Sequence, residues 1–367
     1  MRAVDLGEWC EPSFARHETF HPRFGWLRKA YERNDPSAES VFHRSDATVA
    51  LGVGKNMVNA IRYWSVAFGV LAPYKRPGDR IERYVPTPLA RAIFDEGGWD
   101  PFVEDPATLW VLHWNLLQPP CLAPSWWVAF NLLDAQQFDD TVLAECIAEA
   151  VRSFEGWDNV VPGSIKKDAD CVLRTYASRS SGRQGLDDLL DCPFRDLGLI
   201  EAVEGEARRY RFNTAPKATL PDEVIAYASL MFMARVSPGA RSISLARLAR
   251  DPGSPGQAFK VGERALFEAL ERVSTSDADL SVAEPAGLRQ LHVNDSPAPV
   301  GHKLLGVHFE RAADVRSWES MVGTRTSELK KARQTLTEQS DTIDVLRATS
   351  HVAAIDAELL LLEGVVA

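Results

Sequence analysis

The most regular pattern of hydrophobic and polar positions lies in residues 45–94. Apolar side chains there recur at the i, i+3, i+4, i+7 spacing that places them on one face of a helix. These residues are Met57, Ala60, Ile61, Trp64, Phe68 and Leu71. A shorter helix is expected to end at Leu51–Gly52, and after a tight turn the amphipathic helix begins near Lys55. The pattern therefore predicts two helices joined by a short turn.

The polar side chains of the second predicted helix lie opposite its buried face. At about 100° per residue, Lys55, Asn59 and Arg62 share that face, and Asn56 and Tyr63 lie at its edge. Two short extended segments around a Pro-Gly turn follow, with four basic residues on or beside the turn: Lys75, Arg76, Arg80 and Arg83. Helix, turn, helix and basic hairpin is the order of a winged helix-turn-helix, whose second helix enters the major groove of DNA.

The local charge favours nucleic acid as the partner of this module, although winged helices also bind proteins and a charged face is often only solvated. Residues 1–95 contain 14 Lys and Arg against 11 Asp and Glu, in a chain whose net charge is −10. DNA-binding proteins draw much of their affinity from the neutralisation of phosphates. We therefore predict that this module contacts nucleic acid.

The stretch between Arg91 and Arg152 has the opposite character. It contains no Lys or Arg, nine Asp and Glu from Glu96 to Glu149, and many aromatic residues, among them Trp110, Trp114, Trp126 and Trp127. Acidic helices of this kind cannot lie along DNA phosphates. They are expected either to pack the modules together or to dock another protein, and the packing role is favoured.

Weaker winged-helix features recur in residues 163–212 and 243–309. In the first segment, helices precede two strand-like pieces around a Gly turn, with basic residues along it: Lys166, Lys167, Arg174, Arg208, Arg209 and Arg211. In the second, a helix, a Gly/Pro turn and a helix precede extended pieces around Asn294–Pro297, and Lys260 and Arg264 are weak signals because such side chains are often only solvated. The predicted fold is mainly α with short β-hairpins (α+β). It is an array of winged helix-turn-helix-like modules with a helical middle and a C-terminal helical tail.

These patterns divide the chain into five segments. The predicted boundaries are 1–95, 96–155, 156–218, 219–310 and 311–367. In the last segment, apolar residues fit an interrupted 3.5-residue register: Val315, Trp318, Val322, Leu329, Ala332, Leu336, Ile343 and Leu346. This segment is a coiled-coil arm, a helix lying on the body or a partly disordered tail, and homodimerisation through it is a hypothesis.

The bulk composition indicates a cytoplasmic protein. The five cysteines have neither a CxxC pair nor His at ligand spacing, which is typical of reduced thiols. No signal region precedes an apolar segment at the N-terminus, and no apolar run reaches the roughly 18–20 residues of a membrane span. We expect neither a zinc site nor membrane insertion.

Enzymatic motifs are scarce. Gly52–Asn56 reads GVGKN, which lacks the spacing and the final Ser or Thr of a phosphate-binding P-loop, so we reject ATP binding there. The densest polar cluster is residues 15–26, where His17, Glu18 and His21 could bind a divalent metal or move protons, beside Arg16 and Arg23. The alternative, which is favoured, is a polar lead-in to a helix near Pro22, with aromatic side chains buried around it: Phe14, Phe20, Phe24 and Trp26.

Four stretches together resemble a known family: FARHETFHPRFGWLRKAY, DATVALGVGKNMVNAIRYWSVAFGVL, YVPTPLARAIF and WVLHWNLL. The chain is similar to the SspB-like family of the bacterial DNA phosphorothioation (Ssp) defence system, strongly over residues 14–135 and generally to about residue 310. The resemblance implies work beside a cysteine desulfurase, an ATPase and an ATP-pyrophosphatase-like sulfur-transfer enzyme. It also implies groove-facing roles for Lys55, Asn56, Asn59 and Arg62, with residues 75–83 on the DNA backbone.

Two functions compete. In the first, the chain is a DNA-nicking endonuclease that opens DNA for sulfur incorporation, with His17, Glu18 and His21 as candidate catalytic residues, Asp46 as an outlying carboxylate, and Mg²⁺ or Mn²⁺ as a candidate cofactor. Nicking rests on the family resemblance, because the chain has no recognised nuclease motif. In the second, it is a non-enzymatic DNA-binding adaptor that recruits the sulfur-transfer enzymes.

Overall fold

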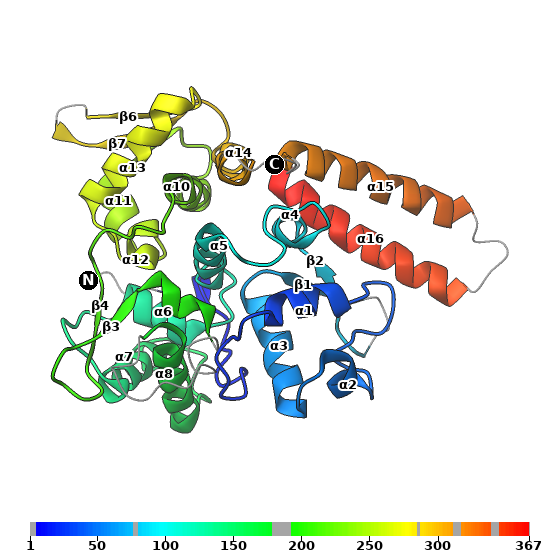
Figure 1. The fold of residues 1–367 in the computed structure, drawn as a ribbon, viewed down its shortest axis with the longest axis horizontal. Helices are drawn as coiled ribbons and strands as arrows, with labels where there is room; N and C mark the ends of the chain where they lie inside the picture. Colours follow the sequence, from blue (N-terminus) through cyan, green and yellow to red (C-terminus); the bar gives the residue numbers. More distant parts are fainter. Residues whose placement is uncertain are drawn as a thin grey trace. The chain divides into compact units, whose positions relative to one another are not determined.

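A computed structural model describes residues 5–75, 80–177, 192–284, 287–310, 317–338 and 345–366. The fold is mainly helical with small antiparallel sheets, as the α+β prediction states (Figure 1). The chain forms two compact units: unit 1 comprises residues 1–24 and 105–305, and unit 2 comprises residues 25–104 and 306–367. The finer division into five segments stays a prediction.

Unit 2 contains the helix–turn–helix segment. Its elements are α1 (Trp26–Arg33), α2 (Ala47–Leu51), α3 (Lys55–Ala67), β1 (Leu71–Tyr74), β2 (Arg83–Pro86), α4 (Pro88–Phe94), α15 (Trp318–Glu338) and α16 (Val345–Val366). The predicted helix ends, at Leu51–Gly52 and Lys55, are confirmed. Gly52 ends α2 in the left-handed conformation with φ 63°, which glycine adopts without steric cost. Trp64 and Phe68 of the predicted stripe are fully buried.

The C-terminal tail is a pair of helices that lie side by side (Figure 1). Arg333 of α15 pairs with Asp356 of α16 at 2.7 Å, and α16 packs against α4 and β2. Trp318, Val322 and Leu329 of the interrupted apolar register are buried. Ala332 is exposed, and Val315 and Ile343 lie outside the described residues. The register therefore packs within one chain, as a helical hairpin on the body of unit 2.

Unit 1 is built mainly of helices: η1 (Leu6–Glu8), α5 (Pro106–Leu116), α6 (Pro124–Asn131), α7 (Asp140–Arg152), α8 (Pro162–Tyr176), η2 (Pro193–Leu197), α10 (Asp222–Val236), α11 (Leu245–Arg250), α12 (Pro255–Phe259) and α13 (Glu263–Ser276). Helix α14 (Pro297–Phe309) begins in unit 1. The strands of unit 1 are β3 (Ile200–Ala202), β4 (Tyr210–Phe212), β5 (Ser242–Ser244), β6 (Leu280–Ala283) and β7 (Gln290–Val293). Strands β3 and β4 form a hairpin, and the other three form an antiparallel sheet in the order β5-β7-β6.

The acidic, Trp-rich stretch forms the centre of unit 1. Trp110, Trp114, Trp126 and Trp127 are each at most 1% exposed. Helix α5 is apolar on all sides, which is typical of a helix enclosed by others. Burial of these rings agrees with the favoured packing role, because buried indoles have no surface to offer a docking partner.

Two details of the second weak winged-helix segment, residues 243–309, differ from the prediction. The extended pieces lie at β6 and β7, and Pro297 begins α14, a position where proline's fixed φ suits a helix start. Lys260 is not solvated: its Nζ donates to Phe130 O at 2.5 Å and lies 4.1 Å from the centroid of the Phe212 ring. Burial lowers the pKa of Lys260 to about 7.

Candidate functional site

The polar face of α3 is narrower than its periodicity predicts. Lys55 and Asn56 are exposed, whereas Asn59 and Arg62 are half-buried. Tyr63, placed by the sequence at the edge of this face, is buried at 9% exposure, and its ring contacts Trp64. The difference arises because packing of α2 and β1 on α3 encloses part of the face that a lone helix would expose.

Three features describe the start of α3 and the turn before it. Gly54 is its N-cap, and no side chain caps it, so its first N–H groups have no intrahelical acceptor. Lys29 of α1 donates from Nζ to Leu51 O at 2.9 Å, which holds the end of α2 beside the turn. Asp46 stands at the N-cap of α2, but its carboxylate binds Arg44 instead of capping the helix. The first turn of α3, with Lys55 and Asn56, therefore faces solvent from a fixed position.

The predicted extended segments form the β1–β2 hairpin, with Leu71 opposite Pro86 and Tyr74 opposite Arg83. Lys75 and Arg80 are exposed, and Arg76 lies outside the described residues. Arg83 is half-buried and donates to Ala38 O. The base of the hairpin is fixed to the loop after α1 by further bonds, including Tyr74 Oη to Pro36 O at 2.6 Å.

Arg62 lies against the hairpin. Burial raises the pKa of Tyr84 in β2, and the nearby Arg62 guanidinium opposes that rise. Burial also lowers the pKa of His43, and Arg62 lowers it further. Arg62 thus has packing partners on β2 and on the loop before α2, in addition to any contact with DNA.

Residues 14–21 form a loop of unit 1 that is anchored on α8. His17 Nε2 lies 2.8 Å from Asp168 Oδ1, and both residues are 1% exposed. Ala15 N donates to the same oxygen at 2.8 Å, and Ser125 Oγ donates to Asp168 Oδ2 at 2.7 Å. The sequence analysis missed Asp168 and Ser125. A carboxylate on the apolar face of α8, one residue before Ala169, was the signal that could have found Asp168.

The same loop holds three non-glycine residues in the left-handed region. Ala15, Glu18 and Thr19 have φ values of 55°, 51° and 66°, a conformation that costs free energy and persists only where the surroundings enforce it. Arg174 contributes by donating from Nη2 to Thr19 O at 2.9 Å. The structure therefore brings His17 and Glu18 into a rigid loop, with Glu18 half-buried.

The aromatic side chains around this cluster are only partly buried. Trp26 is 5% exposed and His21 is also buried, but Phe24 is 58% exposed, and Phe14 and Phe20 are half-buried. The helix begins at Trp26 after Gly25, four residues beyond the predicted position near Pro22. The prediction of a polar lead-in to a helix holds, but the prediction that Phe24 is buried was wrong.

The positions of the His, Cys, Asp and Glu side chains decide whether they could hold a metal ion together. Within the described ranges, no three His, Cys, Asp or Glu side chains come close enough together to hold a metal ion. His17, Glu18 and His21 therefore do not make a three-ligand site in this structure, and no reaction step is assigned to Mg²⁺ or Mn²⁺.

The basic residues of the β3–β4 hairpin have partners within unit 1. Arg208 lies 3.3 Å from Asp140, Arg209 lies 3.4 Å from Asp139, and Arg211 pairs with Glu201 across the hairpin. These ion pairs offset the positive charge that phosphate binding needs. The β1–β2 hairpin, where Lys75 and Arg80 have no ion-pair partner among the described residues, is the better candidate for a DNA contact.

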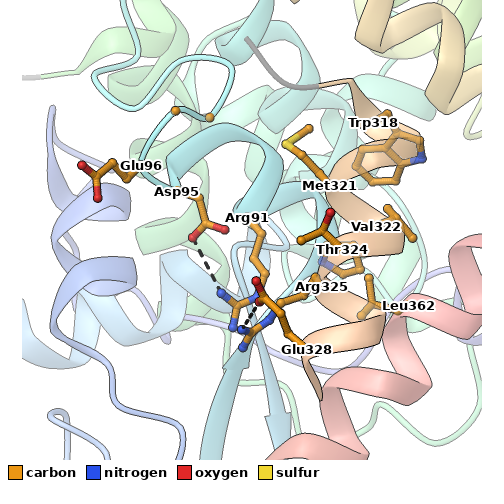
Figure 2. Close-up of a pocket in the computed structure, with 13 residues that line it drawn as sticks. Arg91, Asp95, Glu96, Trp318, Met321, Val322, Thr324, Arg325, Glu328 and Leu362 are labelled. Atoms are coloured by element: carbon orange, nitrogen blue, oxygen red, sulfur yellow. Dashed lines mark hydrogen bonds and ion pairs between the residues drawn. The ribbon is translucent and has the colours of Figure 1, made fainter. Parts of the chain in front are cut away.

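Unit 2 also has a small cavity between α4 and α15 (Figure 2). Its volume is about 70 Å³, and Figure 2 shows Arg91, Asp95, Arg325 and Glu328 around it. Both arginines bind the buried Glu358 of α16, with Arg325 Nε 2.7 Å from Glu358 Oε1. A space of this size is well below the usual volume of a small-molecule site, so the cluster joins helices instead of binding a nucleotide.

Comparisons with known proteins agree with the sequence resemblance. The family described as Protein of unknown function (DUF4007) matches residues 14–309. A solved structure described as "Magnesium ion-bound SspB crystal structure" is 39% identical, with a TM-score of 0.77 over 89% of this chain and 99% of that chain. The chain belongs to the SspB-like family. A second solved structure, "SspB crystal structure", is 38% identical, with a TM-score of 0.78 over 97% of this chain and 99% of that chain.

Membership of the SspB-like family thus extends beyond residues 14–135, where the sequence resemblance is strongest. No curated protein matches the chain. Among the described residues, every helix is too short or too polar to span a bilayer.

Proposed function

We propose that the chain is a DNA-binding component of the DNA phosphorothioation (Ssp) system, and that it nicks one strand to open DNA for sulfur incorporation. Membership of the SspB-like family supports the proposed role in the Ssp system. The exposed first turn of α3, next to a hairpin with exposed cations, is the observation that supports DNA binding. In this proposal, unit 2 contains a winged helix-turn-helix with α3 as the recognition helix.

The proposed DNA contacts divide into two kinds. Lys55 and Asn56, exposed at the start of α3, would reach base edges in the major groove, and the half-buried Asn59 and Arg62 would contact the groove wall. Lys75, Arg80 and Arg83 of the hairpin would bind phosphates, together with Arg76 outside the described residues. The uncapped N–H groups of α3 add a favourable potential for a phosphate.

The proposed nicking chemistry involves the loop of residues 14–21. Glu18 is its half-buried carboxylate, and in the proposal it accepts a proton from the water that attacks the scissile phosphate. His17 is too deeply buried to touch DNA directly and would position the loop through Asp168. His21 stays a candidate for the same reaction. The magnesium ion named for one similar structure supports a test of Mg²⁺ and Mn²⁺.

One observation favours the adaptor as a second candidate function. The hydrogen bond of His17 to Asp168, with both residues 1% exposed, is also what a purely structural polar network would show. In that case the α3 module binds DNA, and the cysteine desulfurase, the ATPase and the sulfur-transfer enzyme supply all the chemistry.

A plasmid assay separates the two candidates. Purified protein is incubated with supercoiled plasmid and Mg²⁺, Mn²⁺ or EDTA, and the same samples are examined by gel shift. Conversion to open circle that is lost in Glu18→Ala, but kept in the exposed control Glu8→Ala, supports the nickase. A gel shift without nicking supports the adaptor, and neither a shift nor nicking contradicts the whole proposal.

DNA binding is tested on matched lysine and arginine variants. Lys55→Ala should lower affinity for a preferred site by about 1–3 kcal/mol and relax base preference. Arg80→Ala should weaken binding to all sequences alike and reduce the salt slope by about 0.9, the effect of one phosphate contact. Lys167→Ala, an exposed lysine of α8, is the control and should change neither quantity. Unchanged affinity in both test variants would rule out the α3 docking surface.

Homodimerisation stays a separate proposal, because the α15–α16 hairpin already packs on its own chain. Light scattering of the full chain and of a form that lacks residues 320–367 tests it. A monomer in both cases excludes self-association through the tail.

A further inference from the structure

Cys10 and Cys121 lie directly opposite each other in unit 1. Cys10 follows η1, and Cys121 lies in the connection between α5 and α6. The two residues are partners in an isolated parallel β-bridge. Glu11 N donates to Cys121 O at 2.9 Å, and Cys121 N donates to Trp9 O at 2.9 Å. Backbone bonds on either side of the pair therefore hold the two cysteines in register.

The two thiols are in contact and shielded from water. Cys10 is 5% exposed and Cys121 is 1% exposed. Burial raises the pKa of the Cys10 thiol, and its hydrogen bond to Cys121 raises that pKa further. The thiol of Cys121 donates in turn to Leu116 O at 3.1 Å. The two side chains are thus enclosed together inside unit 1.

We propose that Cys10 and Cys121 form a dithiol site that a small-molecule disulfide oxidises to an intramolecular disulfide. Paired β-chains lie about 4.8 Å apart, which falls within the range of roughly 4.4–6.8 Å between Cα atoms that a disulfide requires. The backbone bridge already places the two cysteines opposite each other, so the bond needs no large movement of the chain.

The reaction is a balanced thiol–disulfide exchange. One cysteine loses its proton, and its thiolate attacks a sulfur of the small disulfide, which forms a mixed disulfide and releases one small thiolate. The second cysteine then loses its proton and attacks the protein sulfur of the mixed disulfide. The intramolecular bond forms and the second small thiolate leaves. Two electrons pass from the protein to the small disulfide, and the two released protons protonate the two small thiolates.

Such a bond would clamp the segment before the anchored loop of residues 14–21. Trp9 precedes Cys10, and the centroid of its ring lies 5.3 Å from the centroid of the Trp127 ring. The guanidinium of Arg235 lies 4.3 Å from the centroid of the Trp9 ring. In the reduced protein these contacts hold the segment by packing alone, whereas oxidation would fix it covalently to the α5–α6 connection.

The test uses folded full-length protein and oxidised glutathione. Mass spectrometry of the intact chain should show the loss of two hydrogen atoms without retained glutathione, and reduction should reverse it. Trypsin should leave Cys10 on peptide 3–16 and Cys121 on peptide 92–152, which also contains Cys146. The mapping is therefore done in a Cys146→Ser background, where the two peptides should be found cross-linked.

Variants and dynamics complete the test. Cys10→Ser and Cys121→Ser should each abolish the loss of mass, and Cys171→Ser, a buried cysteine of α8, should not. Hydrogen exchange at the Glu11 amide should slow on oxidation of the wild type and stay unchanged in Cys10→Ser. A cross-link to any other cysteine, or one that forms only in denaturant, would overturn the proposal.

Discussion

The imidazole of His17 and the carboxylate of Asp168, 151 residues apart in the chain, are joined by a hydrogen bond of 2.8 Å. The bond fixes the loop that contains the candidate catalytic residues to the buried face of α8. Asp168 also accepts bonds from Ala15 N and Ser125 Oγ. One buried carboxylate therefore sets the conformation of the loop.

Removal of this carboxylate should loosen the loop. Asp168→Ala leaves the half-buried Ala15 N–H and the buried Ser125 hydroxyl without their acceptor. Each unsatisfied group should lower the free energy of unfolding by about 1–3 kcal/mol. We expect a lower free energy of unfolding in urea and faster hydrogen exchange in residues 14–21. Asp168→Asn, which keeps one acceptor oxygen, should recover part of both. The control Asp170→Asn removes an exposed partner of Arg174 and should change the free energy of unfolding by less than about 1 kcal/mol. Equal effects of Asp168→Ala and Asp170→Asn would contradict the anchoring role.

Stability should fall as the pH drops from about 6.5 toward 4. Burial lowers the pKa of His113 to about 4, and burial likewise lowers the pKa of His302 to about 4. Between these values and the ordinary pKa of histidine, the unfolded chain binds protons that the folded chain does not, so acidification favours unfolding. His113 Nε2 donates to Ala258 O at 2.8 Å, and its Nδ1 accepts from Tyr176 Oη at 2.7 Å.

Urea denaturation at several pH values checks this dependence. In His113→Phe, the free energy of unfolding should change less steeply with pH between pH 4 and 6.5, even if the variant is less stable overall. Tyr176→Phe removes the donor to Nδ1 and should cost about 1–3 kcal/mol at neutral pH. A slope identical in wild type and His113→Phe would contradict a neutral, buried His113.

The helical hairpin of unit 2 should depend on Glu358. Burial alone raises the pKa of this carboxyl, but the guanidinium groups of Arg325 and Arg91 outweigh it and hold the pKa below its ordinary value. The stabilisation is therefore present above the ordinary pKa of glutamate and is lost as the pH falls through the lower folded value. Glu358→Gln should cost about 3 kcal/mol, since it removes the buried carboxylate that both partly buried guanidinium groups share.

Limited proteolysis detects the loss of that contact. Residues 318–366 of Glu358→Gln should be cleaved faster than in the wild type at neutral pH. Glu363→Gln, which changes an exposed residue of the same helix, should be cleaved at the wild-type rate. Equal protection of both variants would show that apolar packing alone holds α15 and α16 on α4 and β2.

Gly253 should tolerate no side chain. A Cβ at this position would overlap the ring of Trp9, and its φ of 75° is left-handed. Gly205 has a similar φ of 78° but open space around it, so Gly205→Ala carries the strain without the overlap. Gly253→Ala should therefore be less stable than Gly205→Ala by about 1–3 kcal/mol. Thermal unfolding measures the difference, and equal melting temperatures would contradict the close packing of Trp9.

Several local features could be predicted from the sequence because they depend on residues close together in the chain. The turn at Gly52, the start of the helix at Lys55 and the hairpin after it follow from hydrophobic periodicity and turn chemistry. The same holds for burial of the tryptophans in α5 and α6, where apolar runs leave no polar face. The motifs were also sufficient to indicate the SspB-like family.

Tertiary structure alone decided which distant residues meet. Asp168 beside His17 and Glu358 beside Arg91 are contacts across 151 and 267 residues, and no periodicity reaches over such distances. Packing also decided that Tyr63 is buried and that the Lys260 ammonium lies against Phe130 and Phe212, because neighbouring elements cover surfaces that each helix or turn would expose if isolated. Local propensity thus determined the elements, and the pairing of buried polar groups determined how the candidate site is held.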